Sequence, residues 1–93
     1  MDRSPLLSVV VICWNSLERL RQLLDSVPGA LAGIPHELIL IDNGSTDGTA
    51  DYIASFHPEI IYRRLDSNRG VAAARNRGIA LAKGDCIWLL DDD

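Results

Sequence analysis

Four short runs of strand-like sequence, separated by stretches with helical spacing, constrain the fold of this 93-residue chain more than any other feature. The runs cover residues 6–13, 37–41, 60–64 and 86–90, and the first and last are almost entirely apolar. Strands that are buried on both faces, as in a parallel sheet, have this continuous apolar character. The runs therefore predict four parallel strands.

Helical spacing is clearest after the first strand. Apolar residues recur at intervals of three and four from residue 17 to residue 27. Asn15-Ser16 is expected to cap this helix, and Pro28-Gly29 is expected to end it. The pattern predicts one helix between the first two strands.

A second helix is predicted to begin at Ser45 or Thr46, either of which can act as the N-cap, with Asp47 in its first turn. Its buried face is expected to hold Ile53 and the alanines at positions 50 and 54.

A third, alanine-rich helix is predicted over residues 71–83, with Gly84 as a left-handed C-cap. Its small residues are expected to let it lie close against the sheet. The resulting βαβαβαβ order predicts an α/β fold with three layers, in which helices cover both faces of a parallel sheet through right-handed crossovers.

The acidity of the chain is local. The net charge is -4, and three of the acids are the adjacent Asp91, Asp92 and Asp93. This balance argues against general binding to nucleic acid or to an anionic membrane. No apolar run reaches the ~20 residues that a membrane span needs. We expect Cys13 and Cys86 to be reduced, buried and unpaired, as in a cytosolic protein.

Polar residues follow the ends of the predicted strands. Trp14-Asn15 follows the first, Asp42 opens the turn after the second, and Asp91 begins the acidic triplet after the fourth, while Asn68 lies in the loop after the third. Ligands of open parallel sheets bind outside the carboxyl ends of the strands. We therefore expect one crevice in which an aromatic ring stacks on a base and carboxylates hold a metal.

The triplet suits a hard cation. Mg²⁺ and Mn²⁺ prefer one or two carboxylates together with phosphate oxygens and water. Asp91 and Asp93 have the spacing that lets both side chains face one ion at a strand end. The alternative is a solvated acidic turn, and oxygen ligands alone leave Mg²⁺ and Mn²⁺ open.

Four segments together resemble the N-terminal half of a family 2 glycosyltransferase with the Rossmann-like GT-A fold. They are SVVVICWN (8–15), LILIDNGSTDGT (38–49), NRGVAAARNRG (68–78) and GDCIWLLDDD (84–93). The resemblance implies that residues 1–93 form the nucleotide-sugar-binding part of such a domain. It also implies that the acceptor-binding half, with the general base of inverting members, lies beyond Asp93.

The resemblance also implies roles for single residues. Asp42 matches a carboxylate that binds the base, and Trp14, with Cys13 and Asn15 beside it, matches the first motif. Asn68 and Arg75 match polar residues of the third motif on the donor side of the crevice. Asp91 matches a residue near the ribose and the metal, and Asp93 matches one that binds the metal bridging the diphosphate, with Asp92 in the variable position between them.

Several of these residues could instead have a purely structural role. Asp42 can serve only to open a turn, Trp14 can be a core residue, and Arg75 can pair with a nearby acid on the helix surface. The first motif usually reads Pro-Thr-Tyr-Asn, and the Trp14-Asn15 version resembles a subgroup with rhamnosyltransferase-like enzymes. Asp92, as an acid in the variable middle position, leaves open which pair binds the metal.

The leading hypothesis is metal-dependent, inverting transfer of a sugar from a UDP- or dTDP-sugar to a saccharide or lipid-linked acceptor, with the full-length protein at the membrane periphery. One alternative is a phosphotransferase that uses Asp-x-Asp. The other is a non-catalytic, receiver-like signalling domain. We expect the 93-residue chain to be inactive in transfer on its own and to form a homodimer or to pack against a partner.

Overall fold

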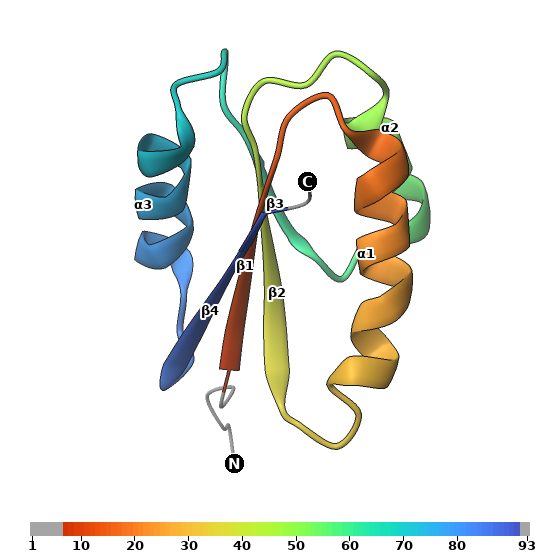
Figure 1. Cartoon of the computed structure of the whole chain (residues 1–93), viewed down its shortest axis with the longest axis vertical. Helices are drawn as coiled ribbons and strands as arrows, with labels where there is room; N and C mark the ends of the chain where they lie inside the picture. Colours follow the sequence, from red (N-terminus) through yellow and green to blue (C-terminus); the bar gives the residue numbers. More distant parts are fainter. Residues whose placement is uncertain (1–6, 92–93) are drawn as a thin grey trace.

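A computed structural model describes residues 7–91 as a four-stranded parallel sheet with three helices (Figure 1). The strands are β1 (Leu7–Cys13), β2 (His36–Asp42), β3 (Ile61–Arg64) and β4 (Cys86–Asp91). The helices are α1 (Leu17–Ala30), α2 (Thr49–Phe56) and α3 (Val71–Leu81). The predicted βαβαβαβ order is confirmed, and no helix of the described residues is long and apolar enough to cross a membrane.

The strand order is β3-β2-β1-β4, and every neighbouring pair is parallel. The first two crossovers therefore step one way from β1, and the third returns past β1 to the other edge. Right-handed crossovers that run in opposite directions place their helices on opposite faces. Figure 1 shows this arrangement, with α1 and α2 on one face and α3 on the other, so the predicted three-layer α/β/α fold is confirmed.

Alternate residues of the central strands fill two hydrophobic layers. Val9 and Val11 of β1 pack with Leu20 and Leu24 of α1, whereas Val10 faces the layer beneath α3. Side chains alternate between the two faces of a strand. Both faces of β1 are therefore in the core, which explains why its sequence is apolar throughout.

Helix α3 approaches the sheet closely because its contact face carries small residues. Ala74 and Gly78 are its buried residues. A Cβ atom on Gly78 would lie 2.3 Å from Cγ1 of Val10. Val71, the first residue of the helix, is exposed.

Two predicted helix ends are wrong. Helix α1 continues through Pro28 to Ala30, where Pro28 is exposed and the amide of the buried Leu31 still donates to Val27. Gly84 is not a left-handed cap, since α3 ends earlier and Ala82 is extended. Gly84 is instead needed for close approach, because a Cβ there would lie 2.7 Å from the backbone N of Ser8.

The predicted start of the second helix is also wrong. Helix α2 begins at Thr49, after Gly48 in the left-handed region. Asp47 precedes the helix rather than lying in its first turn. Ile53 is buried as expected, but Ala50 and Ala54 are exposed, because the short helix contacts the core mainly through Thr49 and Ile53.

Strand β4 forms an exposed edge of the sheet. Ile87, Trp88 and Leu89 are each at least 40% exposed. Cys86 is exposed too, which corrects the expectation that both cysteines are buried: it opens this edge strand. Cys13 is buried, and no disulfide joins it to Cys86. They lie at opposite ends of the neighbouring strands β1 and β4.

Candidate functional site

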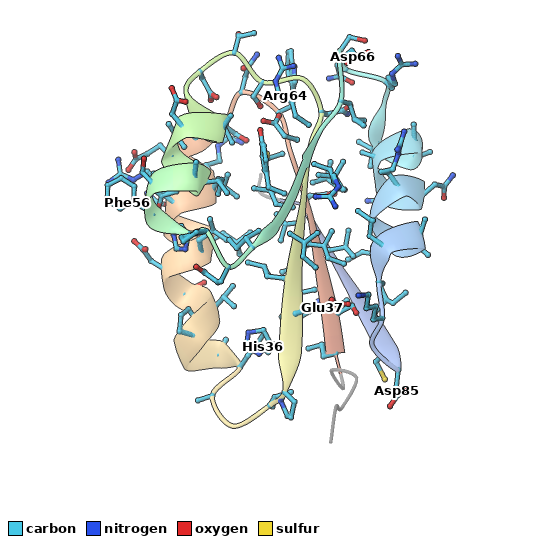
Figure 2. All side chains as sticks on the ribbon, turned by 180° about the vertical axis from the view of Figure 1, so that it is seen from behind. His36, Glu37, Phe56, Arg64, Asp66 and Asp85 are labelled. Carbon is cyan, nitrogen blue, oxygen red and sulfur yellow. The ribbon has the colours of Figure 1, made fainter. Side chains whose placement is uncertain are left out.

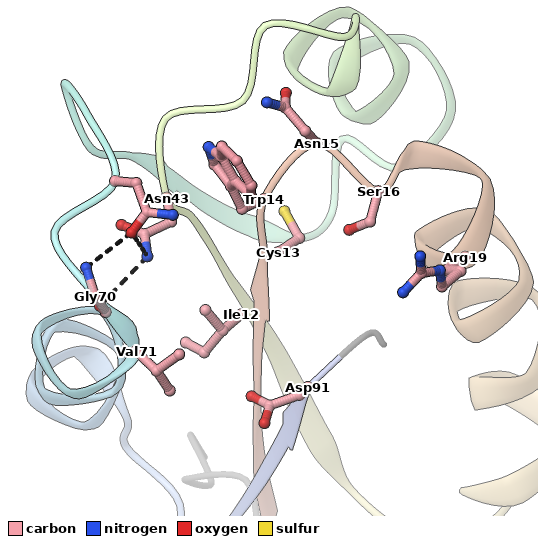
Figure 3. A pocket seen from close by; sticks show the side chains of 11 residues that line it. Ile12, Cys13, Trp14, Asn15, Ser16, Arg19, Asn43, Gly70, Val71 and Asp91 are labelled. Atoms are coloured by element: carbon pink, nitrogen blue, oxygen red, sulfur yellow. Dashed lines mark hydrogen bonds between the residues drawn. The ribbon is translucent and has the colours of Figure 1, made fainter.

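The carboxyl ends of β1 and β4 border a pocket with a volume of about 400 Å³ (Figure 3). Its walls are residues 12–16 at the end of β1, Arg19 of α1, Asn43 after β2, Asn68, Gly70 and Val71 around the start of α3, and Asp91 of β4. The strand order reverses between β1 and β4, since β2 and β3 follow on one side of β1 and β4 lies on the other. The pocket therefore lies at the switch point where open parallel sheets bind ligands. Arg64 and Asp66 mark the same end of the sheet from behind, while Glu37 and Asp85 lie toward the opposite end (Figure 2).

Trp14 stands on the pocket wall directly after β1. Its side chain is 51% exposed, so the alternative that it is a core residue is excluded. Its neighbour Cys13 also lines the pocket but is almost fully buried. An exposed indole at a pocket wall offers a flat face for stacking a planar ligand.

Asn15 fixes the loop after β1 to the loop after β2. Its backbone has φ 47°, in the left-handed region that asparagine tolerates better than most residues. Its side-chain Oδ1 accepts a hydrogen bond of 2.8 Å from the Thr46 amide, and its own amide donates to Oγ of Ser45 at 2.9 Å. These polar groups of Asn15 are therefore engaged with the protein itself.

Asp47 joins the same two loops from the other side. Its Oδ2 accepts from the amide of Leu17, and its Oδ1 accepts from the amide and hydroxyl of Thr49. One carboxylate thus caps both α1 and α2, where the Ser16 side chain makes no cap hydrogen bond and Gly48 has no side chain. A negative charge near the first turn of a helix also complements the helix dipole.

Asn43 ties β2 to the loop before α3. Its Oδ1 accepts from the Arg69 amide at 2.9 Å, and its Nδ2 donates to Oδ1 of Asn68 at 3.1 Å and to the Gly70 carbonyl at 3.3 Å (Figure 3). The Asn68 carboxamide also accepts from the Gly70 amide. Asn43 is only 2% exposed, so this wall of the pocket is held by a buried amide.

Asp42 lies beneath the pocket rather than on its surface. It is fully buried, its Oδ1 accepts from the Ser45 amide at 2.8 Å, and its Oδ2 accepts a short hydrogen bond from the Tyr62 hydroxyl. Burial, with the hydrogen bond to Asp42 and its charge, raises the pKa of the Tyr62 phenol far above its usual range. Asp42 does open the turn after β2, which is the structural role considered as the alternative for this residue.

Asp91 reaches the pocket from the end of β4 and pairs with Arg75 of α3. Nη2 of Arg75 lies 3.1 Å from Oδ2 of Asp91, and both side chains are about two-fifths exposed (43% and 42%). The ion pair considered as the structural alternative for Arg75 is thus present, and its acid is the pocket residue Asp91. Asp92 and Asp93 lie outside the described residues.

Within residues 7–91, no group of three or more His, Cys, Asp or Glu side chains is placed to hold a metal ion. Mg²⁺ and Mn²⁺ commonly take only one or two protein carboxylates, with phosphate and water as the other ligands. Asp91 supplies one such hard oxygen donor on the pocket wall. The chemistry of this donor therefore fits a site that the ligand completes.

Asn43 and Arg19 are among the pocket residues that sequence reasoning did not single out. Asn43 looked like an ordinary turn residue, and Arg19 looked like any surface arginine of a helix. Arg19 lies on the pocket wall, one residue before the buried Leu20. The register of the buried leucines of α1 could have placed Arg19 near the sheet, but nothing in the sequence separates it from the exposed Arg21.

Solved structures with a similar fold include a mannosyltransferase and a protein in complex with a nucleotide sugar. The mannosyltransferase PcManGT from Pyrobaculum calidifontis, in complex with GDP-Man and Mn²⁺, superposes with a TM-score of 0.77 and 26% identity, over 98% of this chain and 28% of that one. S. aureus TarS 1-349 in complex with UDP-GlcNAc superposes with a TM-score of 0.78 and 27% identity, over 94% of this chain and 26% of that one. The GT-A fold expected from the sequence is confirmed.

Curated relatives include the uncharacterized glycosyltransferase YfnE of Bacillus subtilis, which is 38% identical over 88 residues. Succinoglycan biosynthesis protein ExoO of Rhizobium meliloti is 34% identical over 94 residues. These matches cover 92% and 100% of this chain, but the chain spans only 22% and 27% of the relatives' own lengths.

The family model described as Glycosyl transferase family 2 matches residues 8–93, nearly the whole chain. This match favours the leading hypothesis over the phosphotransferase and the receiver-like alternatives. The chain belongs to glycosyl transferase family 2.

Proposed function

We propose that this chain forms the donor-binding part of a glycosyltransferase and holds a nucleotide-diphosphate sugar in the pocket between β1 and β4. The observation that carries the proposal is that one pocket at the switch point joins the exposed ring of Trp14 to the carboxylate of Asp91. The ligands named in the similar structures, GDP-Man and UDP-GlcNAc, support a nucleotide sugar as the donor.

The base would stack on Trp14. Base–aromatic stacking contributes roughly 1–3 kcal/mol per base. Asn43 and Asn68 also line the pocket, and a hydrogen bond joins their side-chain amides. Asp42 would support the part of the site that binds the base indirectly. It holds the turn after β2 through the Ser45 amide and accepts a hydrogen bond from Tyr62.

The diphosphate would lie toward Asp91. A divalent cation bound there would neutralise the charge that develops on the leaving diphosphate. Asp91, with Asp93 as the expected second carboxylate, would hold that cation, and Arg19 would place a positive charge on the other side of the pocket. Hard oxygen donors suit Mg²⁺ and Mn²⁺ alike.

Transfer would proceed with inversion to a saccharide or lipid-linked acceptor. The general base and the acceptor site are proposed to lie in sequence that corresponds to the rest of the longer relatives. The described residues would bind and orient the donor, and we propose that the chain alone does not turn over.

The exposed edge strand supports the proposal of self-association. Ile87, Trp88 and Leu89 present apolar surface along β4, with no charge or proline inside the run. Open apolar edges of this kind invite pairing with a further chain. Sedimentation equilibrium tests this: a dimer is expected, and a monomer at high concentration contradicts it.

Calorimetric titration with UDP, dTDP and GDP, each with and without Mn²⁺, tests the donor-binding proposal. We expect metal-dependent binding of one nucleotide, which Asp91→Ala abolishes or strongly weakens. The matched control is Asp85→Ala, which removes a carboxylate at the opposite end of the sheet (Figure 2). Binding of no nucleotide, or equal effects of both substitutions, would contradict the proposal.

A further inference from the structure

The ion pair between Arg75 and Asp91 occupies one of the two carboxylate oxygens that could coordinate a metal. Nη2 of Arg75 donates to Oδ2 of Asp91 at 3.1 Å. The two residues come from α3 and β4, sixteen positions apart in sequence, so the contact exists only in the folded chain. Its two charges balance each other at the edge of the pocket.

A second nitrogen of the Arg75 guanidinium has no hydrogen-bond partner among the described residues. This nitrogen, Nε, is buried. A buried donor left without a partner costs free energy. Arg75 contacts Asp91 through one end of the group, at Nη2, and this single contact lacks the second parallel hydrogen bond of a bidentate pair.

We propose that Arg75 is the resident cation of the Asp91 position and competes with a divalent cation for it. The inference rests on the proposed function, in which Asp91 is a metal ligand. A metal on Oδ2 would sit within a few ångströms of the guanidinium, and like charges at that separation repel. Arg75 thus keeps metal affinity low in the free chain, and the negative diphosphate of an arriving nucleotide would offset the repulsion.

Titration with Mn²⁺ alone tests this, with the electron paramagnetic resonance signal of free Mn²⁺ as the readout. Arg75→Met removes the charge and keeps the length of the side chain. We expect it to tighten Mn²⁺ binding by about threefold, the scale of one solvent-screened ion pair. Arg75→Lys keeps the charge and is expected to stay close to the unsubstituted chain.

The matched control is Arg77→Met, which removes an equal charge from an exposed position on the same helix. Circular dichroism checks that each variant is folded. Tightening in Arg75→Met but not in Arg77→Met supports the inference. Equal tightening in both variants reflects net charge and overturns the inference. Unchanged or weaker Mn²⁺ binding in Arg75→Met overturns it as well. In either case, Mn²⁺ binding by the unsubstituted chain would still support the metal role of Asp91. Absence of Mn²⁺ binding in every protein overturns the metal role of Asp91 and this inference with it.

Discussion

The side-chain oxygen of Asn43 accepts a hydrogen bond of 2.9 Å from the backbone amide of Arg69, across 26 residues of sequence. This contact attaches the loop before α3 to the end of β2. The same carboxamide donates to Asn68 and to the Gly70 carbonyl. One buried side chain therefore shapes a whole wall of the pocket.

Replacing Asn43 by Ala is expected to destabilise the chain by roughly 1–3 kcal/mol, because buried partners lose their hydrogen bonds. Nucleotide binding should weaken as well, since the loop at Asn68 is released. Asn43→Asp keeps an acceptor for the Arg69 amide but sets a buried carboxylate oxygen against the oxygens of Asn68 and Gly70, so it should destabilise at least as much. Urea denaturation and calorimetry measure the two effects, and an Ala variant as stable as the unsubstituted chain would refute this account of the wall.

The contact of α3 with the sheet depends on the absence of a side chain at Gly78. Gly78→Ala places a Cβ 2.3 Å from Cγ1 of Val10, and overpacking of this kind costs about 1–3 kcal/mol. Gly29→Ala is the control, since nothing lies within 4 Å of its Cβ position and alanine in a helix gains up to about 1 kcal/mol. Urea denaturation should therefore give opposite signs for the two substitutions, and the same sign for both would contradict the close packing of α3.

Asp47 is expected to make stability depend on acid. Burial raises its pKa, but the hydrogen bonds from the Thr49 hydroxyl and from the amides of Leu17 and Thr49 outweigh burial and lower it below 3.8. A carboxyl whose pKa is lowered by folding stabilises the folded state in full when the pH is above its pKa in the unfolded chain. This stabilisation is lost as the pH falls through the pKa of the folded state. The stability difference between the unsubstituted chain and Asp47→Asn should thus be largest near neutral pH and shrink in acid. A difference that is constant or grows in acid would contradict the capping role.

Trp14 is expected to matter for the ligand and little for the fold. Its ring is half exposed, so Trp14→Ala should change the free energy of unfolding only slightly. Nucleotide binding should weaken by about tenfold or more, the effect of losing one stacked base, and Trp14→Phe should restore part of it. Trp88→Ala is the control, because Trp88 is exposed to a similar degree but does not line the pocket. Equal losses of binding in the two alanine variants would argue against stacking.

The strands and the layer order were predictable because burial on both faces leaves a strong apolar signal, as in residues 9–12. The ends of helices were harder, since they depend on contacts that the sequence does not reveal. Pro28 suggested an end of α1, yet an exposed proline in the last turns is tolerated when the buried Leu31 anchors the turn. Gly84 suggested a cap, yet its small size serves an approach to Ser8 on a distant strand.

The sequence predicted the location of the site but not the hydrogen bonds that shape it. Parallel topology brings Trp14, Asn68 and Asp91 to one edge, and that much follows from strand order. The partners of Asn15 and Asn43 lie 25 or more residues away, so only the folded chain shows that these amides hold loops together.

The most direct test of the central claim is to map nucleotide binding by amide chemical shifts in a ¹⁵N–¹H NMR titration with UDP and Mg²⁺. The account predicts that the shifts concentrate at the pocket between β1 and β4, at the amides of Trp14, Gly70 and Asp91. Shifts that cluster instead at the pocket between α1 and β2, around His36 and Ile60, would contradict it, as would a titration with UDP, dTDP and GDP that moves no amide of the first pocket.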